Sequence, residues 1–446
     1  MVHTQNYAER ATKILREWKK ENYAFGLGVI NRLAEFTGTA GKSTVLVVTG
    51  WGSEEWVDPI VNRIESLIRK EDVDILDIIR GAKANAPRED VYRIANQIAK
   101  KRPDSIVAVG GGSTIDAAKV ASVLASLDCD DIEPYFGMGQ ITERLKKEGK
   151  KPFPLVAVQT AASSGAHLTK YANITDPLSG QKKLIIDEAI VPSFAVFDYM
   201  TTIEAPYAVT TDGALDGVAH SLEVIYGATG KSFFNKAMRI AEVSISLIVE
   251  NLPKAVADPK AEGPRVGLGL GTDLGGYAIM VGGTNYGHLF SFSLVNLLTH
   301  GRACALVNPY AAVFFSSAIE PQLRMVGRIF AEKGYLNEDL GKLRGGKLGM
   351  AVAKAMVNFS RTIKFPTTLD EVGGSEEDKK RILTAAKDPQ LWSKLEQAPV
   401  SLIARDVQGR IDRCRTEANI DEYMGPLIDA VRSGDFEKIK TMPVGE

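Results

Sequence analysis

The sequence predicts an α/β domain, in which helices cover a parallel sheet, followed by an all-helical domain. Three observations carry this prediction. Short β-branched runs alternate with amphipathic segments up to about residue 204, one run ends in the triple glycine Gly110-Gly-Gly112, and helical spacing without strand-like alternation continues beyond that point. A chain of 446 residues exceeds what one compact core holds, so we expect two domains, 1–204 and 205–446, with the boundary near Glu204-Ala-Pro206.

The elements of the first domain alternate in regular order. A charged amphipathic stretch, Tyr7 to Glu21, predicts an additional helix within the first 22 residues. Apolar β-branched runs predict buried strands, and 3.6-residue spacing predicts the helices between them. In order, we expect a strand over 43–49, a helix over 57–70, a strand over 73–77, a helix over 90–101, and strands over 106–109 and 155–158. In the second domain we expect helices over 235–251, 345–362 and 376–387.

Composition and charge narrow the class of protein. Hydrophobic residues make up 45% of the chain and charged residues 24%, which are ordinary values for a soluble globular protein. A formal net charge of −1 argues against a nucleic-acid or acidic-lipid partner. The cysteines Cys129, Cys304 and Cys414 form no CxxC pair, the N-terminal segment carries charges throughout, and no uncharged apolar stretch reaches the ~20 residues of a membrane span. We therefore expect a cytoplasmic protein without a membrane partner.

The triple glycine lies in Ser105-Ile-Val-Ala-Val-Gly110-Gly-Gly-Ser113-Thr-Ile-Asp116-Ala-Ala-Lys119. Glycine permits positive φ and close approach of a ligand to the backbone, and Ser113 or Thr114 is expected to cap a helix that begins at Ile115. A strand, a glycine-rich turn and a helix N-terminus together form an anion site, as in Rossmann-like dinucleotide-binding domains, although the spacing is not G-x-G-x-x-G. An ordinary βα turn is the alternative.

Three of the five histidines form a constellation with an aspartate. Asp216 and His220 are four residues apart, which places both on one face of a helix, and His288 and His300 follow, twelve positions apart. One carboxylate and three imidazoles complete a four-ligand N/O site for a divalent metal. Taken alone, the first pair is equally well a solvated helix face or a single hydrogen bond, and the later histidines are polar residues in Gly- and Ser-rich connections.

These segments together resemble the iron-dependent (group III) alcohol dehydrogenases. The resemblance covers nearly the whole chain, and the order and separation of the segments make it specific. The segments are Phe25-Gly-Leu-Gly28, Gly110-Gly-Gly-Ser-Thr-Ile-Asp-Ala-Ala-Lys119, Thr160-Ala-Ala-Ser-Ser-Gly165, Ile174-Thr-Asp176, Val191-Pro-Ser-Phe-Ala-Val-Phe-Asp198, Asp216-x-x-x-His220, His300-Gly-Arg-Ala303 and Phe365-Pro-Thr-Thr-Leu369.

The resemblance implies a metal site and a dinucleotide site. The implied metal ligands, which act in catalysis through the metal, are Asp216, His220, His288 and His300. Iron is the implied metal and zinc the alternative, and the ion would act as a Lewis acid on the alcohol or aldehyde oxygen in a cleft between the domains. The residues expected to bind NAD(P) are Gly50, Gly110, Gly111, Gly112, Ser113, Asp116, Thr160, Ser163 and Lys183, with Lys119 supporting the turn.

The choice between NAD and NADP depends on the end of the strand over 43–49. An acidic residue at that position binds the ribose 2′-hydroxyl and excludes a 2′-phosphate. Gly50-Trp-Gly-Ser53 has no carboxylate, which favours NADP, whereas Glu54 and Glu55 would repel the phosphate and no Arg or Lys stands nearby to attract it. The segment on balance favours NADP.

Two positions depart from the family pattern. Many members carry a further histidine four residues after the third ligand, for relay of the hydroxyl proton, and this chain has Phe292 instead. A relay would need water or another group. His167, in the loop after Thr160, either faces the cleft or is a loop histidine bonded to backbone.

Lys182 and Lys183 align roughly with a family lysine that touches the cofactor, and an exposed loop lysine is the alternative.

The leading hypothesis is a metal-dependent oxidoreductase that transfers hydride between NAD(P)(H) and a small primary alcohol, a diol or the corresponding aldehyde. Relatives suggest a homodimer or a larger homo-oligomer. The expected cleft side chains are Tyr286, Phe290, Phe292 and Trp51, and the scarcity of basic residues next to the predicted metal ligands argues against a phosphorylated substrate. The alternatives are a dehydroquinate synthase-like lyase, a polyol-phosphate dehydrogenase and a non-catalytic scaffold.

Overall fold

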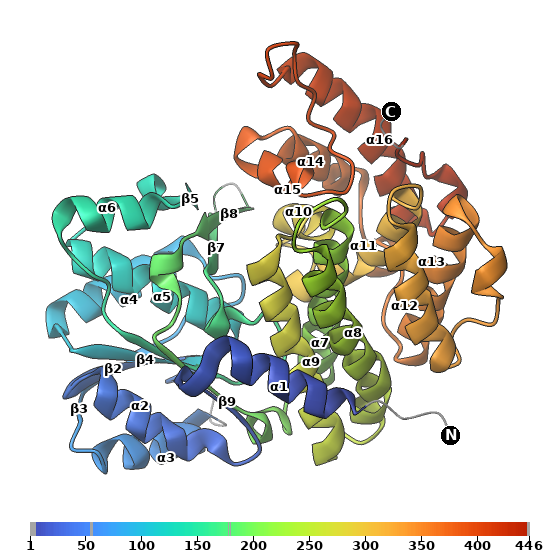
Figure 1. The fold of residues 1–446 in the computed structure, drawn as a ribbon. Helices are drawn as coiled ribbons and strands as arrows, with labels where there is room; N and C mark the ends of the chain where they lie inside the picture. The colour runs from blue at the N-terminus through green and yellow to red at the C-terminus, as the bar shows by residue number, and fades with distance from the viewer. Residues whose placement is uncertain (1–5, 54–56, 177, 179, 444–446) are drawn as a thin grey trace. The chain divides into compact units, whose positions relative to one another are not determined.

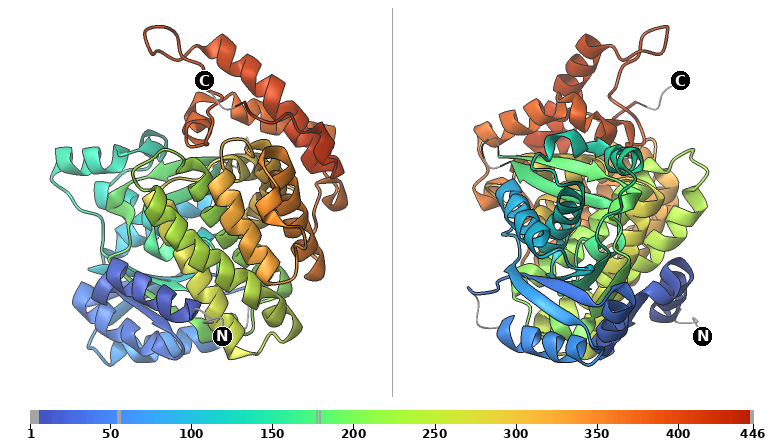
Figure 2. Two further views of the ribbon diagram at one scale, coloured as in Figure 1. Left: turned by 45° about the vertical axis from the view of Figure 1, so that its right-hand side comes forward. Right: turned by 90° about the vertical axis from the view of Figure 1, so that its left-hand side faces the viewer.

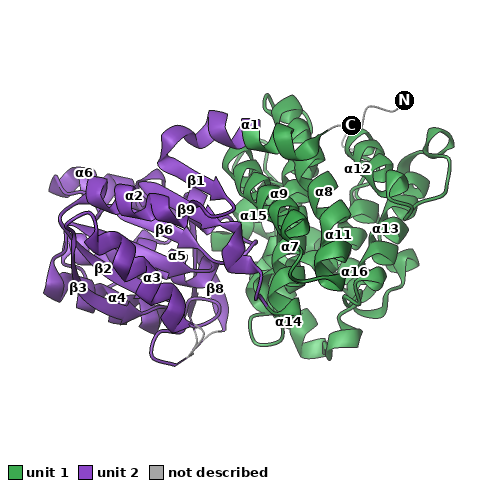
Figure 3. Cartoon of the chain, turned by 90° about the horizontal axis from the view of Figure 1, so that it is seen from below, with its two compact units in different colours: residues 1–12, 206–446 green, residues 13–205 purple. Residues whose placement is uncertain are grey.

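The computed structural model describes residues 6–53, 57–176, 178 and 180–443. The chain divides into two compact units, one of Lys13–Ala205 and one of Met1–Thr12 with Pro206–Glu446 (Figure 3). The additional N-terminal helix is α1, Tyr7–Lys19, so the division between Thr12 and Lys13 falls inside it.

The unit Lys13–Ala205 is built on a six-stranded sheet with the order β1-β9-β6-β4-β2-β3 (Figure 1). The strands are β1 Tyr23–Gly26, β2 Ser43–Val48, β3 Asp74–Arg80, β4 Ser105–Gly110, β6 Leu155–Gln159 and β9 Phe194–Asp198. Each neighbouring pair runs parallel. The carboxyl ends of all six strands therefore lie at the same edge of the sheet.

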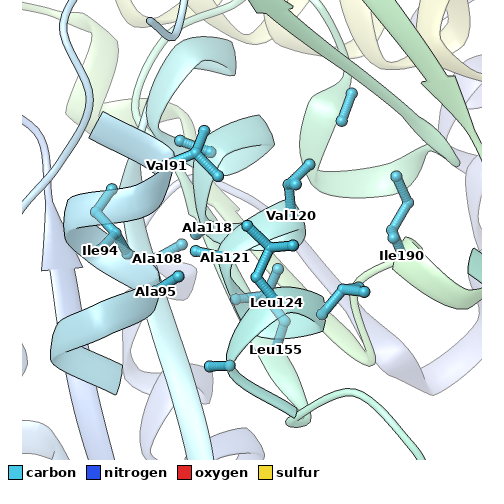
Figure 4. Close-up of a cluster of buried hydrophobic side chains, with 14 of the residues drawn as sticks. Val91, Ile94, Ala95, Ala108, Ala118, Val120, Ala121, Leu124, Leu155 and Ile190 are labelled. Atoms are coloured by element: carbon cyan, nitrogen blue, oxygen red, sulfur yellow. The ribbon is translucent and has the colours of Figure 1, made fainter. Parts of the chain in front are cut away.

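Alternate residues of each strand face opposite layers of helices. Val45 and Val47 belong to the core under α4, Arg88–Lys101, and α5, Gly112–Leu127, and Figure 4 shows part of this cluster. Leu46 and Val48 belong to the core on the other face, under α2, Arg32–Ala40, and α3, Asp58–Arg69. Because both faces are covered, the strands are apolar almost throughout, and this is why short apolar runs predicted them.

A second, three-stranded sheet has the order β5-β8-β7. Its strands are β5 Gly137–Met138, β7 Tyr171–Asp176 and β8 Gln181–Ile186, and α6, Gln140–Glu148, follows β5. In the antiparallel β7–β8 hairpin, Thr175 stands opposite Lys182. The backbone N–H of Thr175 donates to Ala86 O at 3.0 Å, so the hairpin is attached to the loop that follows β3.

The unit that contains Pro206–Glu446 is helical (Figure 2). Its helices after α1 are α7 Tyr207–Gly227, α8 Phe234–Ala257, α9 Glu262–Val281, α10 Tyr286–Ser293, α11 His300–Phe314, α12 Glu320–Glu332, α13 Gly345–Thr362, α14 Glu376–Ala386, α15 Trp392–Glu396 and α16 Arg413–Ser433. Helices α7 and α9 pack closely through glycines, because a Cβ at Gly275 would lie 2.9 Å from Gly217 O. Within the ranges that the structure describes, no helix combines the length and apolar character needed to cross a membrane.

The predicted fold class is confirmed, with an α/β unit followed by a helix-rich region. The predicted strands match β2, β3, β4 and β6, and the predicted later helices match α8, α13 and α14. Strand β3 continues to Arg80, three residues beyond the predicted end, and α5 begins at Gly112 instead of Ile115.

Candidate metal centre and nucleotide site

Helix α7 carries a stripe of acidic and imidazole side chains in its buried middle. Asp216, His220 and Glu223 stand at positions i, i+4 and i+7, so they share one helix face. Asp216 is 2% exposed and His220 is 3% exposed, and His220 Nε2 lies 3.8 Å from Asp216 Oδ2. The pair is therefore a buried, convergent arrangement and not a solvated helix face.

Two further imidazoles reach the same carboxylate from neighbouring helices. His288 lies in α10, and His300 is the first residue of α11. Their Nε2 atoms lie 3.9 Å and 4.0 Å from Asp216 Oδ1. The His288 ring stacks on that of His220 with centroids 4.9 Å apart, and it meets His300 edge-on at 5.0 Å. The structure thus brings the four residues that the sequence singled out into one cluster.

The donor atoms of this cluster fit a divalent metal ion. Among the described residues, Asp216 Oδ1 and His288 Nε2 are buried and have no hydrogen-bond partner. Such orphaned polar atoms are rare in protein interiors. Their separation of 3.9 Å is too long for a hydrogen bond. Two ligand atoms that each lie about 2.1 Å from a shared ion are roughly 3 to 4 Å apart, which agrees with the observed spacing.

Burial keeps the His220 imidazole in the neutral form. It lowers the pKa of His220 to about 4, and His288 adds to this effect, although Asp216 and Glu223 act in the opposite direction. At neutral pH the ring therefore retains a lone pair, which metal ligation requires.

Cys304 belongs to the same cluster and was missed by the sequence analysis. It lies one turn after His300 in α11, is fully buried, and places Sγ 3.9 Å from His300 Nδ1. Ligand atoms of Asp216, His288, His300 and Cys304 lie within 4.8 Å of one another. The i, i+4 spacing from His300 is the signal that could have identified this thiol.

Glu223 contacts the nitrogen of His288 that faces away from Asp216. Its carboxylate accepts a hydrogen bond from His288 Nδ1 at 2.8 Å and one from the backbone N–H of Asn285 at 2.5 Å. A Cβ at Gly287 would lie 2.5 Å from Glu223 Oε1, so glycine at this position lets the carboxylate reach the ring. Burial opposes ionisation, but His288, Asn285 and Lys394 outweigh it, and the pKa of Glu223 lies below its usual value.

A buried lysine, Lys394 in α15, stands beside the turn that leads into α10. Its side chain donates a hydrogen bond to Thr284 Oγ1, and its Nζ lies 5.8 Å from the centroid of the Phe292 ring. Burial lowers the pKa of Lys394 to about 8, against the opposing effects of Glu223 and Cys304. The sequence analysis expected few basic residues near the cluster and did not foresee the Lys394 ammonium, because α15 lies about a hundred residues after the two later histidines in the sequence.

The aromatic residues expected to line a cleft are packed in the interior. Tyr286, Phe290 and Phe292 are at most 1% exposed, and the Tyr286 ring contacts Phe314 and Phe315. Every residue of α10 is buried, which makes it a core helix without a solvated face. These three side chains are therefore closed to bulk solvent, and their place in a substrate cleft stays a prediction. Trp51, in the other unit, is partly buried against the sheet core.

The expected nucleotide-binding residues gather at the carboxyl ends of three adjacent strands. Gly50 follows β2, Gly110 ends β4 and Thr160 follows β6, and these strands are neighbours in the sheet. The backbone N–H of Thr160 donates to Gly110 O at 3.1 Å. The crevice at this edge of an open parallel sheet is where such folds bind dinucleotides.

Helix α5 begins at Gly112 with Gly111 as its N-cap residue, and no side chain caps it. The predicted cap was wrong, because both hydroxyls serve the loop after β3. Ser113 Oγ accepts from Asn85 N–H, and Thr114 Oγ1 donates to Ala82 O. The first N–H groups of α5 consequently have no acceptor within the helix and are available to an anion.

The loop after β6 packs directly on this helix start. A Cβ at Gly112 would lie 2.6 Å from Ser164 Oγ and 3.2 Å from Ser164 Cβ, so a larger residue here would require the Ser164 side chain to move. In the same loop, Ser163 Oγ accepts a hydrogen bond of 3.4 Å from Gln159 Nε2. The start of α5 and the loop after β6 are therefore in direct contact.

Asp116 joins α5 to β7. It is buried, accepts a hydrogen bond from Asn173 N–H at 3.0 Å, and pairs with Lys119 Nζ at 3.4 Å. Lys119 also donates to the carbonyls of Thr169 and Tyr171. These contacts hold the hairpin against the helix that carries the glycine-rich turn.

The two lysines of β8 have different surroundings. Lys183 Nζ pairs with Glu133 at 2.7 Å and lies over the Phe136 ring. Lys182 is 3% exposed and stands opposite Thr175. Adjacent strand residues point to opposite faces, so the two lysines cannot serve one ligand in the same way.

Two further expectations are corrected in this unit. His167 is 1% exposed, its Nε2 lies 3.2 Å from the Tyr23 hydroxyl, and its ring meets Phe197, so it is a packed interior residue.

Arg80 pairs in register with Val48 and is exposed, so a basic residue does stand next to the end of β2. The extension of β3 beyond its predicted end places it there. Glu54 and Glu55 lie outside the described residues.

A parallel sheet with a glycine-rich turn at its carboxyl edge and a buried carboxylate–imidazole cluster are the parts that an oxidoreductase with a nicotinamide cofactor and a metal ion requires. Two family models match the chain, "Iron-containing alcohol dehydrogenase" over residues 20–199 and "Fe-containing alcohol dehydrogenase family, C-terminal" over residues 210–402. The chain belongs to the iron-containing alcohol dehydrogenase family. It is an oxidoreductase, and the lyase alternative finds no support.

Characterised relatives are similar over most of their length. The chain is 26% identical over 313 residues to the NAD-dependent methanol dehydrogenase of Bacillus methanolicus, covering 70% of this chain and 77% of the relative. It is 25% identical to alcohol dehydrogenase 4 of Saccharomyces cerevisiae and 24% identical to the 1,3-propanediol dehydrogenase of Citrobacter freundii, in each case over 79% of this chain and 87% of the relative.

Solved structures share the fold. An alcohol dehydrogenase from Oenococcus oeni has a TM-score of 0.75 at 23% identity and covers 90% of this chain and 98% of its own. The NADH-dependent butanol dehydrogenase A of Thermotoga maritima has a TM-score of 0.72 at 22% identity and covers 92% of this chain and 97% of its own.

Proposed function

We propose that Asp216, His220, His288 and His300 hold one catalytic metal ion, and that the enzyme interconverts a small primary alcohol or diol with its aldehyde. The observation that carries this proposal is the pair of buried, unpartnered ligand atoms, Asp216 Oδ1 and His288 Nε2, in the centre of the cluster. Each His ring directs a nitrogen toward the same carboxylate, at 3.8 to 4.0 Å.

Cys304 is the competitor for the fourth ligand position, because its Sγ, and no atom of His220, belongs to the group of ligand atoms that lie within 4.8 Å of one another. We nevertheless propose His220, on the basis of the ring nitrogen that each residue meets. The thiol lies against His300 Nδ1, whereas His300 Nε2 is the nitrogen that approaches Asp216. One ion cannot bind both nitrogens of the same ring. Mixed carboxylate and imidazole ligation suits ferrous iron, and zinc is the alternative.

The bound metal supplies Lewis acidity, which lowers the pKa of an alcohol and polarises a carbonyl. The protein supplies the position of the substrate and the exclusion of water. Asp216 and the imidazoles fix the position at which substrate oxygen is held, and the buried helices around them keep bulk water from the reacting atoms. Phe292 cannot carry a proton, so the hydroxyl proton leaves through water or through a group on another element.

For the cofactor we propose a pyrophosphate bound by the backbone N–H groups at the start of α5, with Gly50, Gly110–Ser113, Thr160 and Ser163 lining the site. The absence of a carboxylate from Thr49 to Ser53 and the exposed guanidinium of Arg80 favour NADP over NAD. Of the two β8 lysines aligned with the family lysine, Lys183 pairs with Glu133, so a cofactor contact by Lys183 would have to compete with that ion pair. Asp116 would act by holding the hairpin in place.

The substrate class follows from the relatives, whose names describe dehydrogenases of methanol, 1,3-propanediol and butanol. A small primary alcohol or diol is common to them. The homodimer suggested by the family remains a prediction, as does the cytoplasmic location.

The test is metal analysis of anaerobically purified protein, combined with turnover of NADH and NADPH on short-chain aldehydes. We expect about one metal ion per chain in the wild type, loss of metal in His220→Ala, and retention of metal in the matched control His167→Ala. Metal retained in His220→Ala and lost in Cys304→Ser would replace His220 by Cys304 in the ligand set.

A further inference from the structure

We propose that two buried charged residues, Glu223 and Lys394, position His288 for metal binding, Glu223 through His288 Nδ1 and Lys394 through Thr284 and the charge of Glu223. Neither residue is a proposed metal ligand, so both are positioning residues. The proposal rests on the ligand set proposed above.

The first step is the orientation of the His288 ring. A neutral imidazole carries one proton, and the nitrogen that donates it cannot bind a metal. The Glu223 carboxylate accepts from Nδ1 at 2.8 Å, which leaves the lone pair on Nε2, 3.9 Å from Asp216 Oδ1. A carboxylate behind a histidine ligand fixes both its tautomer and its ring angle.

The second step is the position of α10, the helix that carries His288. Glu223 binds the N–H of Asn285, and the Asn285 side chain donates to Glu223 O at 2.8 Å, so α7 holds the turn before α10 by two bonds. Lys394 binds Thr284 Oγ1 in the same turn. Helix α10 therefore starts from a turn that is fixed by both α7 and α15.

The third step is charge. Glu223 is 2% exposed and Lys394 is 3% exposed, and a buried charge is costly unless an opposite charge compensates it. In the part of the chain that the structure describes, Lys394 makes no ion pair within 4.0 Å, but it binds Thr284 while Glu223 binds the next residue, Asn285, so the two opposite charges meet the same turn. Lys394 is thus the distant cation that compensates the Glu223 carboxylate.

The α15 segment is built to stay in this place. A Cβ at Gly227, at the end of α7, would clash with Gln397 O, and one at Gly283 would clash with the Gln397 side chain. Two glycines therefore let the residues after Lys394 pack tightly against both α7 and the turn. The metal site consequently depends on a segment more than a hundred residues beyond the ligand that it positions.

The test measures Zn²⁺ affinity of metal-free protein by chelator competition, without any activity assay. We expect Glu223→Gln to weaken Zn²⁺ binding by about 10- to 100-fold, the range seen when the partner of a metal-bound histidine is removed. Lys394→Met should weaken it less in the wild-type background and should have no further effect in a Glu223→Gln background. Asp187→Asn is the matched control, because Asp187 is a buried carboxylate with several hydrogen bonds and no contact to the cluster.

Equal Zn²⁺ affinity in wild type and Glu223→Gln would overturn the proposal, and so would an equal loss from Lys394→Met in both backgrounds. Failure of the wild type to bind Zn²⁺ would instead overturn the proposed ligand set. Should Glu223→Gln not fold, ¹⁵N-histidine NMR of metal-free wild type at pH 8 decides the matter. His288, assigned by loss of its signals in His288→Gln, is expected as the Nδ1–H tautomer, and the Nε2–H tautomer would refute the proposal.

Discussion

Lys394 should leave a measurable signature in the pH dependence of stability. Its pKa is about 8 in the folded protein and 10.5 in the unfolded chain. Between these values the unfolded state binds more protons than the folded state, so stability rises as pH increases through that window. The difference between the two pKa values corresponds to roughly 3 kcal/mol, and about 2.5 kcal/mol of this should appear between pH 7 and pH 10.

The assay is equilibrium urea unfolding of metal-free wild type and Lys394→Met over that pH range. Because the two proteins share every other titrating group, the difference between their curves isolates Lys394. We expect the wild type to gain roughly 2 to 3 kcal/mol relative to the variant between pH 7 and pH 10. Parallel curves, with a difference that stays constant within about 0.5 kcal/mol, would show that the ammonium is not desolvated in the folded protein.

Three further predictions concern the nucleotide site and the thiol. Gly112→Ala places a Cβ 2.6 Å from Ser164 Oγ and should weaken NADH and NADPH binding about tenfold in fluorescence titrations. Gly263→Ala, with open space around the added Cβ, is the control and should bind both cofactors as the wild type does. Equal cofactor affinity in the two variants would contradict the proposed nucleotide site. Arg80→Ala should raise KM for NADPH about tenfold and leave KM for NADH unchanged. Arg102→Ala, on the amino side of β4, is the control and should change neither KM. An equal effect of Arg80→Ala on both cofactors would show that Arg80 does not bind the 2′-phosphate. Cys304→Ser should retain its metal, as judged by metal analysis, and loss of the metal would make the thiol a ligand.

Much of the α/β unit follows from sequence because its strands are buried on both faces and carry nearly uninterrupted apolar runs. The β7–β8 hairpin was not predicted, because Gln181–Ile186 contains two lysines. A lysine in a sequence normally indicates an exposed position, although one of these two is buried in the structure. The start of α5 was placed too late because apolar spacing begins at Ile115, whereas the helix begins at glycines whose geometry is set by the loop after β3.

The metal cluster was predictable where local spacing carries the signal. Asp216 and His220 lie one turn apart in a helix, so their convergence is visible in sequence. Lys394 could not be inferred in this way, because its place beside the turn before α10 arises from packing of α15 against α10. Cys304 was overlooked although it has the same i, i+4 relation to His300, since a single buried cysteine resembles an ordinary core residue.

The composition of the ligand set is tested most directly by X-ray absorption spectroscopy of zinc-loaded protein. Zinc lies about 2.0 to 2.1 Å from imidazole nitrogen and about 2.3 Å from thiolate sulfur, so the two candidates for the fourth position give different spectra. We predict nitrogen and oxygen neighbours without sulfur, as Asp216, His220, His288 and His300 require. A sulfur neighbour at about 2.3 Å would contradict the account and would place Cys304 on the metal.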